Sequence, residues 1–326
     1  MNMASKKTLV TGSAGFIGST LCKKLLDRGD SVVGIDNHNN YYDPKIKDAR
    51  LKRLTKYPNY KHYKLDLSDS HSLDEIFKKY KIQKVVNLAA QAGVRYSIEN
   101  PLTYINSNIV GFAHILENCR HYQVEHLVYA STSSVYGANT TMPFSEHDSA
   151  NHPLSVYAAS KKSNELMAHT YSYLYQLPTT GLRFFTVYGP WGRPDMALFK
   201  FTKNILENKK IQLYNNGNHS RDFTYISDIV SGIFSILKKN NNTKNLFNTF
   251  NIGNGNSRKL KDYLKKIEKK LNKKAKITNL PLQLGDIKKT HSDISLLNKY
   301  SNYLPETDIE EGINNFIDWY LKYYKK

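Results

Sequence analysis

Three glycines at intervals of three residues constrain the fold of this chain more than any other feature. Gly12, Gly15 and Gly18 directly follow the short apolar run at residues 7–10 and open an amphipathic stretch at residues 16–26. Because glycine has no Cβ, the first permits a tight turn, the second lets the backbone approach a pyrophosphate, and the third lets a helix pack closely on a strand. The spacing therefore predicts a strand, a phosphate-binding turn and a helix whose N-terminal N–H groups face an anion.

An aspartate ends the next predicted strand, at residues 31–36. Asp36 stands 18 residues after Gly18, and Asn37 follows it where an arginine would suit a 2′-phosphate. A carboxylate at this place accepts hydrogen bonds from the adenosine ribose hydroxyls and repels a 2′-phosphate. The alternative is a set of turn glycines with an ordinary capping aspartate. We expect NAD rather than NADP as the cofactor, bound by Gly12, Gly15, Phe16, Ile17, Gly18, Asp36 and Asn37.

Short apolar runs alternate with helical patterns through the first half of the chain. Further runs stand at residues 84–88, 126–130 and 181–185, and another follows at residues 247–252. Nearly continuous apolar strands separated by helices are typical of a parallel sheet that is covered on both faces. The fold class is therefore α/β, with a Rossmann-type doubly wound parallel sheet and a smaller mixed α/β substrate-binding domain.

The alternating pattern changes after about residue 188. A loop rich in Gly and Pro comes next, then helical and irregular segments, and residues 254–326 read as helices with an intervening loop. We therefore expect the NAD-binding domain at residues 1–188 plus 226–253, and the substrate-binding domain at residues 189–225 plus 254–326.

A tyrosine and a lysine four residues apart carry the predicted chemistry. Tyr157 and Lys161 would share one face of a helix. An ammonium group beside a phenol lowers the pKa of the phenol from about 10 toward neutrality, so that Tyr157 would act as a general base on a sugar hydroxyl. Upstream, the hydroxyl-rich segment at residues 131–137 follows a predicted strand, where active-site hydroxyls would gather.

Together these segments resemble the extended short-chain dehydrogenases/reductases, in the NAD-dependent nucleotide-sugar epimerase family. The likeness covers nearly the whole chain and includes the glycine pattern, the Thr132 segment, the Tyr157/Lys161 pair and residues 221–225. It implies catalytic roles for Thr132, Tyr157 and Lys161, with Lys161 also holding the nicotinamide ribose. It further implies that the adenine lies by Asp66 and Leu67, and that the cofactor phosphates and ribose contact Leu88, Ala89, Ala90 and Gln91.

The two residues after Thr132 distinguish among the reactions of this family. Sugar 4,6-dehydratases have Asp and Glu there, as an acid/base pair for eliminating water, and UDP-xylose synthases typically have Glu at the second position. Here the residues are Ser133 and Ser134, which cannot perform that chemistry. The resemblance therefore favours 4-epimerisation over dehydration and decarboxylation.

Two further segments, at residues 91–97 and 188–197, resemble UDP-glucuronate 4-epimerases. A galactose-type epimerase would lack the Arg-Pro-Asp-Met run that begins at Arg193. Since hydroxyls and a cation suit a C6 carboxylate, we expect that group to lie near Arg193 and to accept hydrogen bonds from Ser133, Ser134 and Thr186. An interdomain structural role is the alternative for Arg193. The alternatives for the function are 4-epimerisation of another UDP-hexose (UDP-glucose/galactose or an N-acetyl form) and decarboxylation of UDP-glucuronate.

The nucleotide must be the firm anchor of the substrate if the sugar is to turn. The resemblance places Arg221 at the pyrophosphate and Asp286 at the ribose of a UDP-sugar. Arg95 is a further phosphate ligand on a mobile loop, and Gln283 stands where some relatives have Arg. Each of the three charged residues could instead form a structural ion pair.

The charge balance raises the question of another partner. Lys and Arg number 47 against 28 Asp and Glu, a formal net charge of +19, which would suit a nucleic acid or an anionic membrane. The lysines within residues 265–274 recur at helical spacing without interleaved aromatics, which favours a solvated helix face. We expect no nucleic-acid and no membrane partner, and a non-catalytic binding module is disfavoured by the presence of Thr132, Tyr157 and Lys161.

The cysteines and the apolar runs limit the possibilities for disulfides, metal sites and membrane spans. Cys22 and Cys119 lie far apart, and neither they nor the 11 His residues show metal-ligand spacing, so we expect neither a disulfide nor a metal. No apolar run reaches the roughly 18 residues that span a bilayer, and residues 1–7 lack the features of a signal peptide. We expect a cytoplasmic protein, and by resemblance a homodimer formed through residues 105–119 and 157–175.

Overall fold

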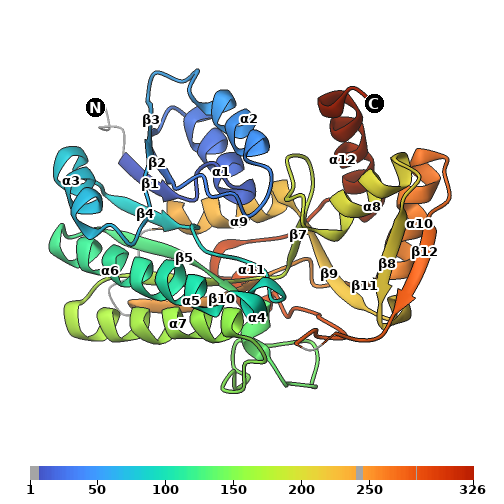
Figure 1. The fold of residues 1–326 in the computed structure, drawn as a ribbon. Coiled ribbons are helices and arrows are strands. Elements are labelled where there is room, and N and C mark those ends of the chain that lie inside the picture. The colour runs from blue at the N-terminus through green and yellow to red at the C-terminus, as the bar shows by residue number, and fades with distance from the viewer. Residues whose placement is uncertain (1–6, 240–244, 284) are drawn as a thin grey trace.

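A seven-stranded parallel sheet forms the centre of the molecule (Figure 1). The computed structural model describes residues 7–239, 245–283 and 285–326; residues 1–6, on which the signal-peptide expectation depends, lie outside it with residues 240–244 and 284. The strands lie in the spatial order β10-β6-β5-β4-β1-β2-β3. They are β1 (Lys7–Thr11), β2 (Ser31–Asp36), β3 (Tyr60–Lys64), β4 (Lys84–Asn87), β5 (His126–Thr132), β6 (Thr179–Phe184) and β10 (Phe247–Ile252).

The strand order reverses beside β1. This strand pairs in parallel with β2 on one side and β4 on the other. Thr11, at its carboxyl end, lies opposite Asn87 of β4, and the Thr11 hydroxyl donates a 2.6 Å hydrogen bond to the Asn87 Oδ1 atom. Such a reversal leaves a crevice outside the carboxyl ends of the strands, where ligands of doubly wound sheets bind. The predicted α/β class and Rossmann-type sheet are confirmed.

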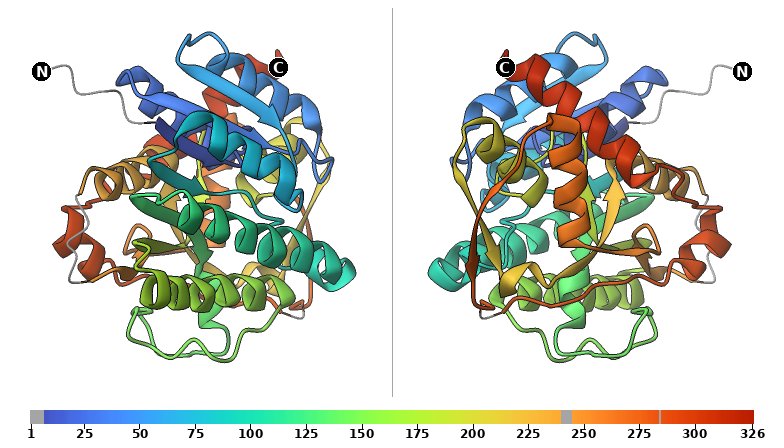
Figure 2. Two further views of the ribbon diagram at one scale, coloured as in Figure 1. Left: turned by 90° about the vertical axis from the view of Figure 1, so that its left-hand side faces the viewer. Right: turned by 90° about the vertical axis from the view of Figure 1, so that its right-hand side faces the viewer.

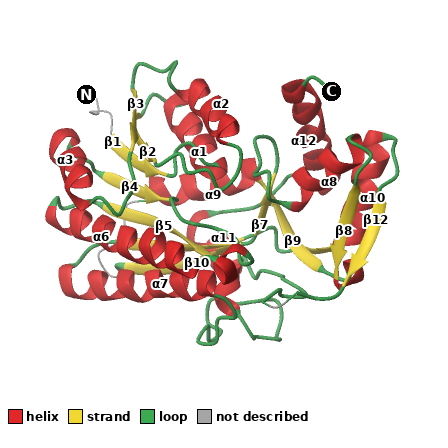
Figure 3. Ribbon diagram, viewed as in Figure 1, coloured by secondary structure: helices red, strands yellow, loops and turns green. Residues whose placement is uncertain are grey.

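Helices cover both faces of the sheet, as Figures 2 and 3 show. Helix α1 illustrates the cause, because its buried residues recur at i, i+3, i+4, i+7 and i+8 from Gly18 to Leu26 and form one apolar face. One core lies beneath α1 (Phe16–Asp27), α2 (Pro44–Leu54), α9 (Ile226–Lys238) and α11 (Ser295–Ser301). The other core lies beneath α3 (Ser70–Tyr80), α6 (Gly111–His121) and α7 (Val156–Tyr175).

A smaller mixed region stands at the carboxyl ends of the strands, on the right of Figure 1. Its core contains a stacked pair, Phe223 and Tyr263, whose ring centroids lie 4.1 Å apart. Its strands are β7 (Thr186–Tyr188), β8 (Lys210–Tyr214), β9 (Ser220–Tyr225), β11 (Ser257–Lys259) and β12 (Lys276–Leu280). Its helices are α8 (Ala197–Leu206), α10 (Leu260–Leu271) and α12 (Ile309–Tyr324).

Short helical segments complete the described part of the chain. They are α4 (Tyr96–Glu99), α5 (Pro101–Tyr104), the π-helix η1 (Ile105–Val110) and the 3₁₀ helices η2 (Ser133–Tyr136) and η3 (Asn215–Gly217). Segments α4, α5 and η1 follow one another and contact α7.

The tail after residue 253 differs from the expectation of helices with an intervening loop. It contains strands β11 and β12, and β12 pairs in parallel with β8, so that Ile277 lies opposite Ile211. Helix α11 and the loop after it return to the large sheet, because Leu297 and Tyr303 are buried in the core beside α9. Residues 295–303, which were expected in the substrate-binding domain, therefore pack against the large sheet of the NAD-binding domain.

Candidate active site

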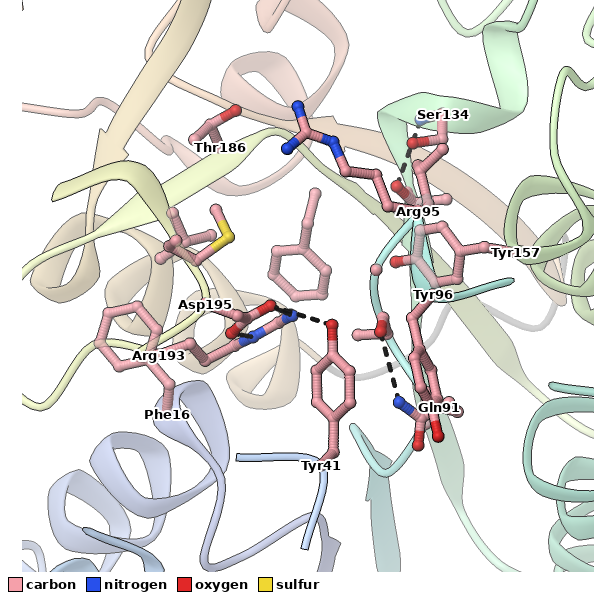
Figure 4. A pocket seen from close by; sticks show the side chains of 18 of the residues that line it. Phe16, Tyr41, Gln91, Arg95, Tyr96, Ser134, Tyr157, Thr186, Arg193 and Asp195 are labelled. Carbon is pink, nitrogen blue, oxygen red and sulfur yellow. Dashed lines mark hydrogen bonds and ion pairs between the residues drawn. The ribbon is translucent and has the colours of Figure 1, made fainter. Parts of the chain in front are cut away.

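A single cavity of about 1010 Å³ gathers the residues singled out from the sequence. It opens along the carboxyl ends of the sheet strands and extends to the smaller region, and Figure 4 shows part of its wall. This volume lies at the upper end of the range for small-molecule sites. Its lining includes every predicted cofactor, catalytic and substrate residue: Gly12, Gly15, Phe16, Ile17, Gly18, Asp36, Asn37, Asp66, Leu67, Leu88, Ala89, Ala90, Gln91, Arg95, Thr132, Ser133, Ser134, Tyr157, Lys161, Thr186, Arg193, Arg221 and Asp286.

The glycine turn forms a cradle that side chains would fill. Gly12 has a φ of +69°, and a Cβ there would lie 2.9 Å from the Ala89 nitrogen. A Cβ on Gly18 would lie 2.1 Å from the Gly12 oxygen. Gly15 caps helix α1 without offering a side-chain hydrogen bond to its first N–H groups. The turn therefore fits a pyrophosphate against the helix N-terminus, as the spacing predicts.

Carboxylates line the other end of the cofactor crevice. Asp36, at the end of β2, accepts hydrogen bonds from the Ala14 nitrogen at 3.1 Å and the His38 nitrogen at 2.9 Å. The Asn37 side chain donates to Asp66 at 2.7 Å. Carboxylate oxygens here fit ribose hydroxyls and disfavour a 2′-phosphate, so the residues present fit NAD.

Helix α7 presents Tyr157 and Lys161 to the cavity beside Thr132 at the end of β5. Ser155 starts this helix by accepting a 3.1 Å hydrogen bond from the Ala158 nitrogen. Lys161 is buried, and burial lowers its pKa to about 8 although the nearby Glu165 carboxylate opposes the change. The lysine therefore retains its charge at neutral pH but loses it in mildly alkaline solution.

The pKa of Tyr157 differs from the expectation. Burial raises it above 10, while the Thr132 hydroxyl and the Arg193 charge act in the opposite direction. In the protein alone, burial outweighs the Thr132 hydroxyl and the Arg193 charge, and the effect of Lys161 on this phenol stays a prediction.

The predicted sugar end of the cavity carries hydroxyls on one side and an ion pair on the other. Thr132 caps the turn η2 by accepting a 3.2 Å hydrogen bond from the Ser134 nitrogen. Arg193 donates from Nε to Asp195 at 3.0 Å and from Nη2 to the second oxygen, and Tyr41 donates to this carboxylate at 3.3 Å (Figure 4). The carboxylate of Asp195 raises the pKa of Arg193, although burial opposes the change. Arg193 is therefore a permanent cation held in place by a partner.

The three predicted nucleotide anchors lie at the far end of the cavity. Arg95 and Asp286 form an ion pair with each other at 2.9 Å, and the Arg95 guanidinium stacks 4.1 Å from the centroid of the Tyr214 ring. Arg221 donates to the Ser220 and Lys288 carbonyls, and burial lowers its pKa to about 10. Charged and aromatic groups thus converge where a diphosphate and a ribose would lie.

Several residues of the site escaped prediction from the sequence. Asp195 and Tyr41 hold Arg193, and the buried Asn108 joins the cofactor loop to α7, exchanging hydrogen bonds with the Gln91 backbone at 2.8 and 3.0 Å and with Ser160 at 3.0 Å. His219 lines the cavity with its Nε2 atom buried and without a hydrogen-bond partner among the described residues. Only Asp195 carries a local signal, its place two residues after Arg193.

The described residues contain neither a membrane-spanning helix nor a cluster of metal ligands. No helix there is long and apolar enough to cross a membrane. No cluster of three or more His, Cys, Asp or Glu side chains in the same part of the chain is placed to hold a metal ion.

The doubly wound sheet, the glycine cradle and the Thr–Tyr–Lys group at its carboxyl edge define the short-chain dehydrogenase/reductase class of enzymes. The sequence model of the NAD dependent epimerase/dehydratase family matches residues 8–253, and the chain belongs to this family. It is therefore an NAD-dependent enzyme, as the sequence predicts.

Individual relatives cover nearly the whole chain. Protein CapI of Staphylococcus aureus is 52% identical, with 98% of this chain and 100% of the relative aligned. UDP-glucuronate 4-epimerase 4 of Arabidopsis thaliana is 45% identical over 97% of this chain and 75% of the plant protein. The crystal structure of UDP-glucuronic acid 4-epimerase from Bacillus cereus, in complex with UDP-glucuronic acid and NAD, has a TM-score of 0.92 at 33% identity, covering 98% of this chain and 100% of that one.

Proposed function

We propose that the protein is a UDP-glucuronate 4-epimerase, which interconverts UDP-glucuronate and UDP-galacturonate through a 4-keto intermediate with tightly bound NAD⁺. The observation that carries this proposal is the set of groups that line the cavity: the hydroxyls of Ser133, Ser134 and Thr186, together with the cation Arg193. Hydroxyls and a cation suit a C6 carboxylate, whereas carboxylates beside Thr132 would repel it. The similarity to UDP-glucuronate 4-epimerases supports this assignment.

Tyr157 is the proposed base that takes the proton from the sugar 4-OH, and the Thr132 hydroxyl acts to lower the pKa of its phenol. Lys161, four residues further along α7, hydrogen-bonds the nicotinamide ribose and stabilises the phenolate. A bound NAD⁺ would supply the hydride acceptor for C4 and, once reduced, the hydride donor for the opposite face, and its positive charge would favour the phenolate. The cofactor is thus regenerated, and no external redox partner is needed.

The proposed intermediate explains why the carboxylate must be held. A 4-keto-glucuronate is a β-keto acid, and it loses carbon dioxide readily only when the bond from C5 to the carboxylate lies parallel to the carbonyl π system. Hydrogen bonds from Ser133, Ser134 and Thr186 would keep the carboxylate out of that geometry. Rotation of the keto sugar about a fixed diphosphate then exposes its other face, which requires the nucleotide anchors Arg221 and Asp286 to hold firmly.

Two other reactions are less well supported. A 4-epimerase for UDP-glucose, UDP-galactose or an N-acetyl sugar has no use for a cation near C6, although relatives of that specificity share the fold. A UDP-glucuronate decarboxylase would need a Glu where Ser134 stands. Each alternative predicts a different product from the same assay.

The test is turnover of UDP-glucuronate by the purified protein, followed by NMR. We expect UDP-galacturonate to form until the two epimers reach equilibrium, without net reduction of NAD⁺ and without UDP-pentose as the main product. Turnover of UDP-glucose but not of UDP-glucuronate would overturn the substrate, and UDP-pentose as the main product would overturn the reaction.

The helices on one face support a homodimer, which we propose as the working assembly. Leu166, Tyr173 and Leu174 form an exposed stripe along α7, at positions i, i+7 and i+8. Leu102 of α5 and Ile105 of η1, on segments that contact α7, are exposed as well. Contiguous exposed apolar side chains of this kind mark interaction surfaces. In a dimer, each α7 would meet its symmetry mate through the same patch.

A further inference from the structure

Arg50, on helix α2, is the largest fully buried side chain among the described residues and lies outside the set predicted from the sequence. All of its donor nitrogens are hydrogen-bonded. Its Nε and Nη2 atoms donate to the Trp191 carbonyl at 3.0 and 2.7 Å, and Nη2 also donates to the Gly192 carbonyl at 3.0 Å. Its Nη1 atom donates to the Ala14 carbonyl at 3.2 Å and to the Tyr42 hydroxyl at 2.9 Å.

These acceptors belong to segments far apart in the sequence. Ala14 lies within the glycine turn, whereas Trp191 and Gly192 are the two residues directly before the cation Arg193. One guanidinium therefore ties the proposed cofactor cradle to the loop that carries the proposed sugar-facing cation. None of the five bonds goes to a carboxylate, and no ion pair of Arg50 is found within the described residues.

Burying an unpaired cation is costly, and only a full set of hydrogen bonds makes it tolerable. An apolar side chain would fill the same space more cheaply if nothing more than packing were required. The guanidinium of arginine is planar and carries five N–H donors in a fixed geometry. It can therefore bond three carbonyls at once and hold them in a fixed arrangement. The arrangement therefore points to a geometric role for Arg50.

The loop beneath Arg50 needs such support. Trp191 has a φ of +65°, a region that bulky residues rarely occupy. Its carbonyl accepts two of the guanidinium bonds, and its ring packs against Trp319 and Tyr323 of α12. At the other end of the loop, Tyr41 donates its hydroxyl to the carboxylate that pairs with Arg193. Segment 41–50 thus holds both ends of the Arg193 loop.

We propose that Arg50 is a positioning residue that fixes the Arg193 loop against the glycine turn, so that the place of Arg193 in the sugar pocket depends on the shape of the cofactor cradle. This inference rests on the proposed function, because it assigns Arg193 to the sugar. It predicts that a change at Arg50 alters cofactor retention and sugar handling together, without contact between Arg50 and either ligand.

The test compares Arg50→Lys with Arg53→Lys, its matched control. Arg53 lies one turn further along α2 and stacks on the Trp191 ring at 4.6 Å, and a lysine there can still place its ammonium over the ring. Lysine at position 50 retains the charge, but its donors all radiate from one nitrogen and cannot reproduce the planar fork whose three nitrogens reach these carbonyls. We expect Arg50→Lys to fold, to lose bound NAD more readily on gel filtration, to raise KM for UDP-glucuronate about tenfold, and to release more UDP-pentose. Arg53→Lys should match the parent protein in all of these.

A double-mutant cycle separates positioning from general stability. If Arg50 acts on the sugar through Arg193, then Arg50→Lys should change neither KM nor the UDP-pentose share further in an Arg193→Met background. If the effects of the two substitutions on KM and on the UDP-pentose share multiply in the double variant, the proposal is overturned. So would an Arg50→Lys protein with a lowered melting temperature but unchanged NAD retention and KM.

A second variant serves if Arg50→Lys fails to fold. Tyr41→Phe removes only the hydroxyl that bonds Asp195, and it should raise the UDP-pentose share in the parent background but not beside Arg193→Met. An unchanged share would overturn the positioning of Arg193 by this segment. If the parent protein converts another UDP-sugar instead, the proposed function fails. The role of Arg50 is then still decided by NAD retention and by the same double-mutant cycle, with KM measured for that sugar.

Discussion

At the scale of single residues, the phenol of Tyr157 gives the most direct test of the proposed chemistry. Tyr157→Phe removes the phenol that is proposed to take the 4-OH proton. Because general-base catalysis contributes about 10²–10⁴-fold, we expect kcat to fall by that factor, with bound NAD and KM little changed. Stopped-flow or NMR turnover of UDP-glucuronate measures it. The control is Tyr173→Phe, on an exposed part of the same helix; a fully active Tyr157→Phe protein would exclude the phenol as base.

The pH profile follows from the same two side chains. As pH rises through about 8, Lys161 loses the proton with which we propose that it stabilises the Tyr157 phenolate, so kcat/KM should fall above this pH. The effect on stability has the opposite sign: since burial lowers the pKa of Lys161 below its ordinary value of 10.5, the unfolded chain binds more protons between about pH 8 and 10.5. This group alone therefore makes the free energy of unfolding rise over that window.

Rates and melting temperatures measured together from pH 6 to 10 distinguish loss of activity from unfolding. A kcat/KM that stays level up to pH 10, in protein that remains folded, would contradict the assigned titration of Lys161.

The sequence predicted the residues of this site that carry a local signal, and it missed those that depend on distant segments. Glycines between a strand and a helix, and a Tyr-Lys pair one turn apart, can be recognised within a short stretch of sequence. All of these residues line the cavity. Tyr41 reaches Asp195 across 154 positions of sequence, and Arg50 reaches Trp191 across 141. Such contacts follow from how loops fold over the sheet, which a single sequence does not reveal.

At the scale of the elements, burial decided which strands could be predicted. The central strands β1, β4 and β5 are buried on both faces, so their apolar runs are nearly continuous. Strand β3 reads YKHYK and lies at the edge of the sheet, and β12 is largely exposed, so neither has an apolar run. Edge strands are held by backbone pairing with a neighbour, which leaves little trace in side-chain type.

Helix α1 and its glycine turn form a unit that one methyl group should disrupt. In Gly18→Ala, the new Cβ would meet backbone atoms of Gly12 and Ser13, which cannot move aside without shifting the turn. We expect the free energy of unfolding to fall by about 1–3 kcal/mol and bound NAD to be lost. Chemical denaturation and the absorbance of released cofactor measure the two effects.

The control lies at the other end of the same helix. Gly29 has a φ of +92° with open space around its missing Cβ, so Gly29→Ala should cost about 1–3 kcal/mol through backbone strain but retain NAD. Equal cofactor loss in both variants would show that stability, rather than the shape of the turn, governs NAD retention.

At the scale of the whole molecule, acids partly neutralise the basic face of α10, and some of the cations behind the net charge of +19 line the cavity. Several lysines of α10, whose spacing raised the question of a basic patch, form ion pairs with acidic residues. Lys266 and Lys269 pair with Glu310 at 2.6 and 2.9 Å, and Lys270 pairs with Asp318 at 2.8 Å. These pairs join α10 to α12, which agrees with the expected solvated helix face. Other cations, Arg193 and Arg221 among them, line a cavity proposed to take two anionic ligands.

The apolar patch on α5 and α7 predicts the assembly of the whole molecule. Leu102 and Leu166 are 75% and 60% exposed on segments that pack against each other. We expect the parent protein to be a dimer by light scattering, and Leu102→Asp/Leu166→Asp to be a folded monomer, because a dimer would bring the new charges together without water. Leu304→Asp, also on an exposed leucine but before α12, should remain dimeric. A parent protein that is monomeric at micromolar concentration, or a double variant that still dimerises, would contradict an interface on this face.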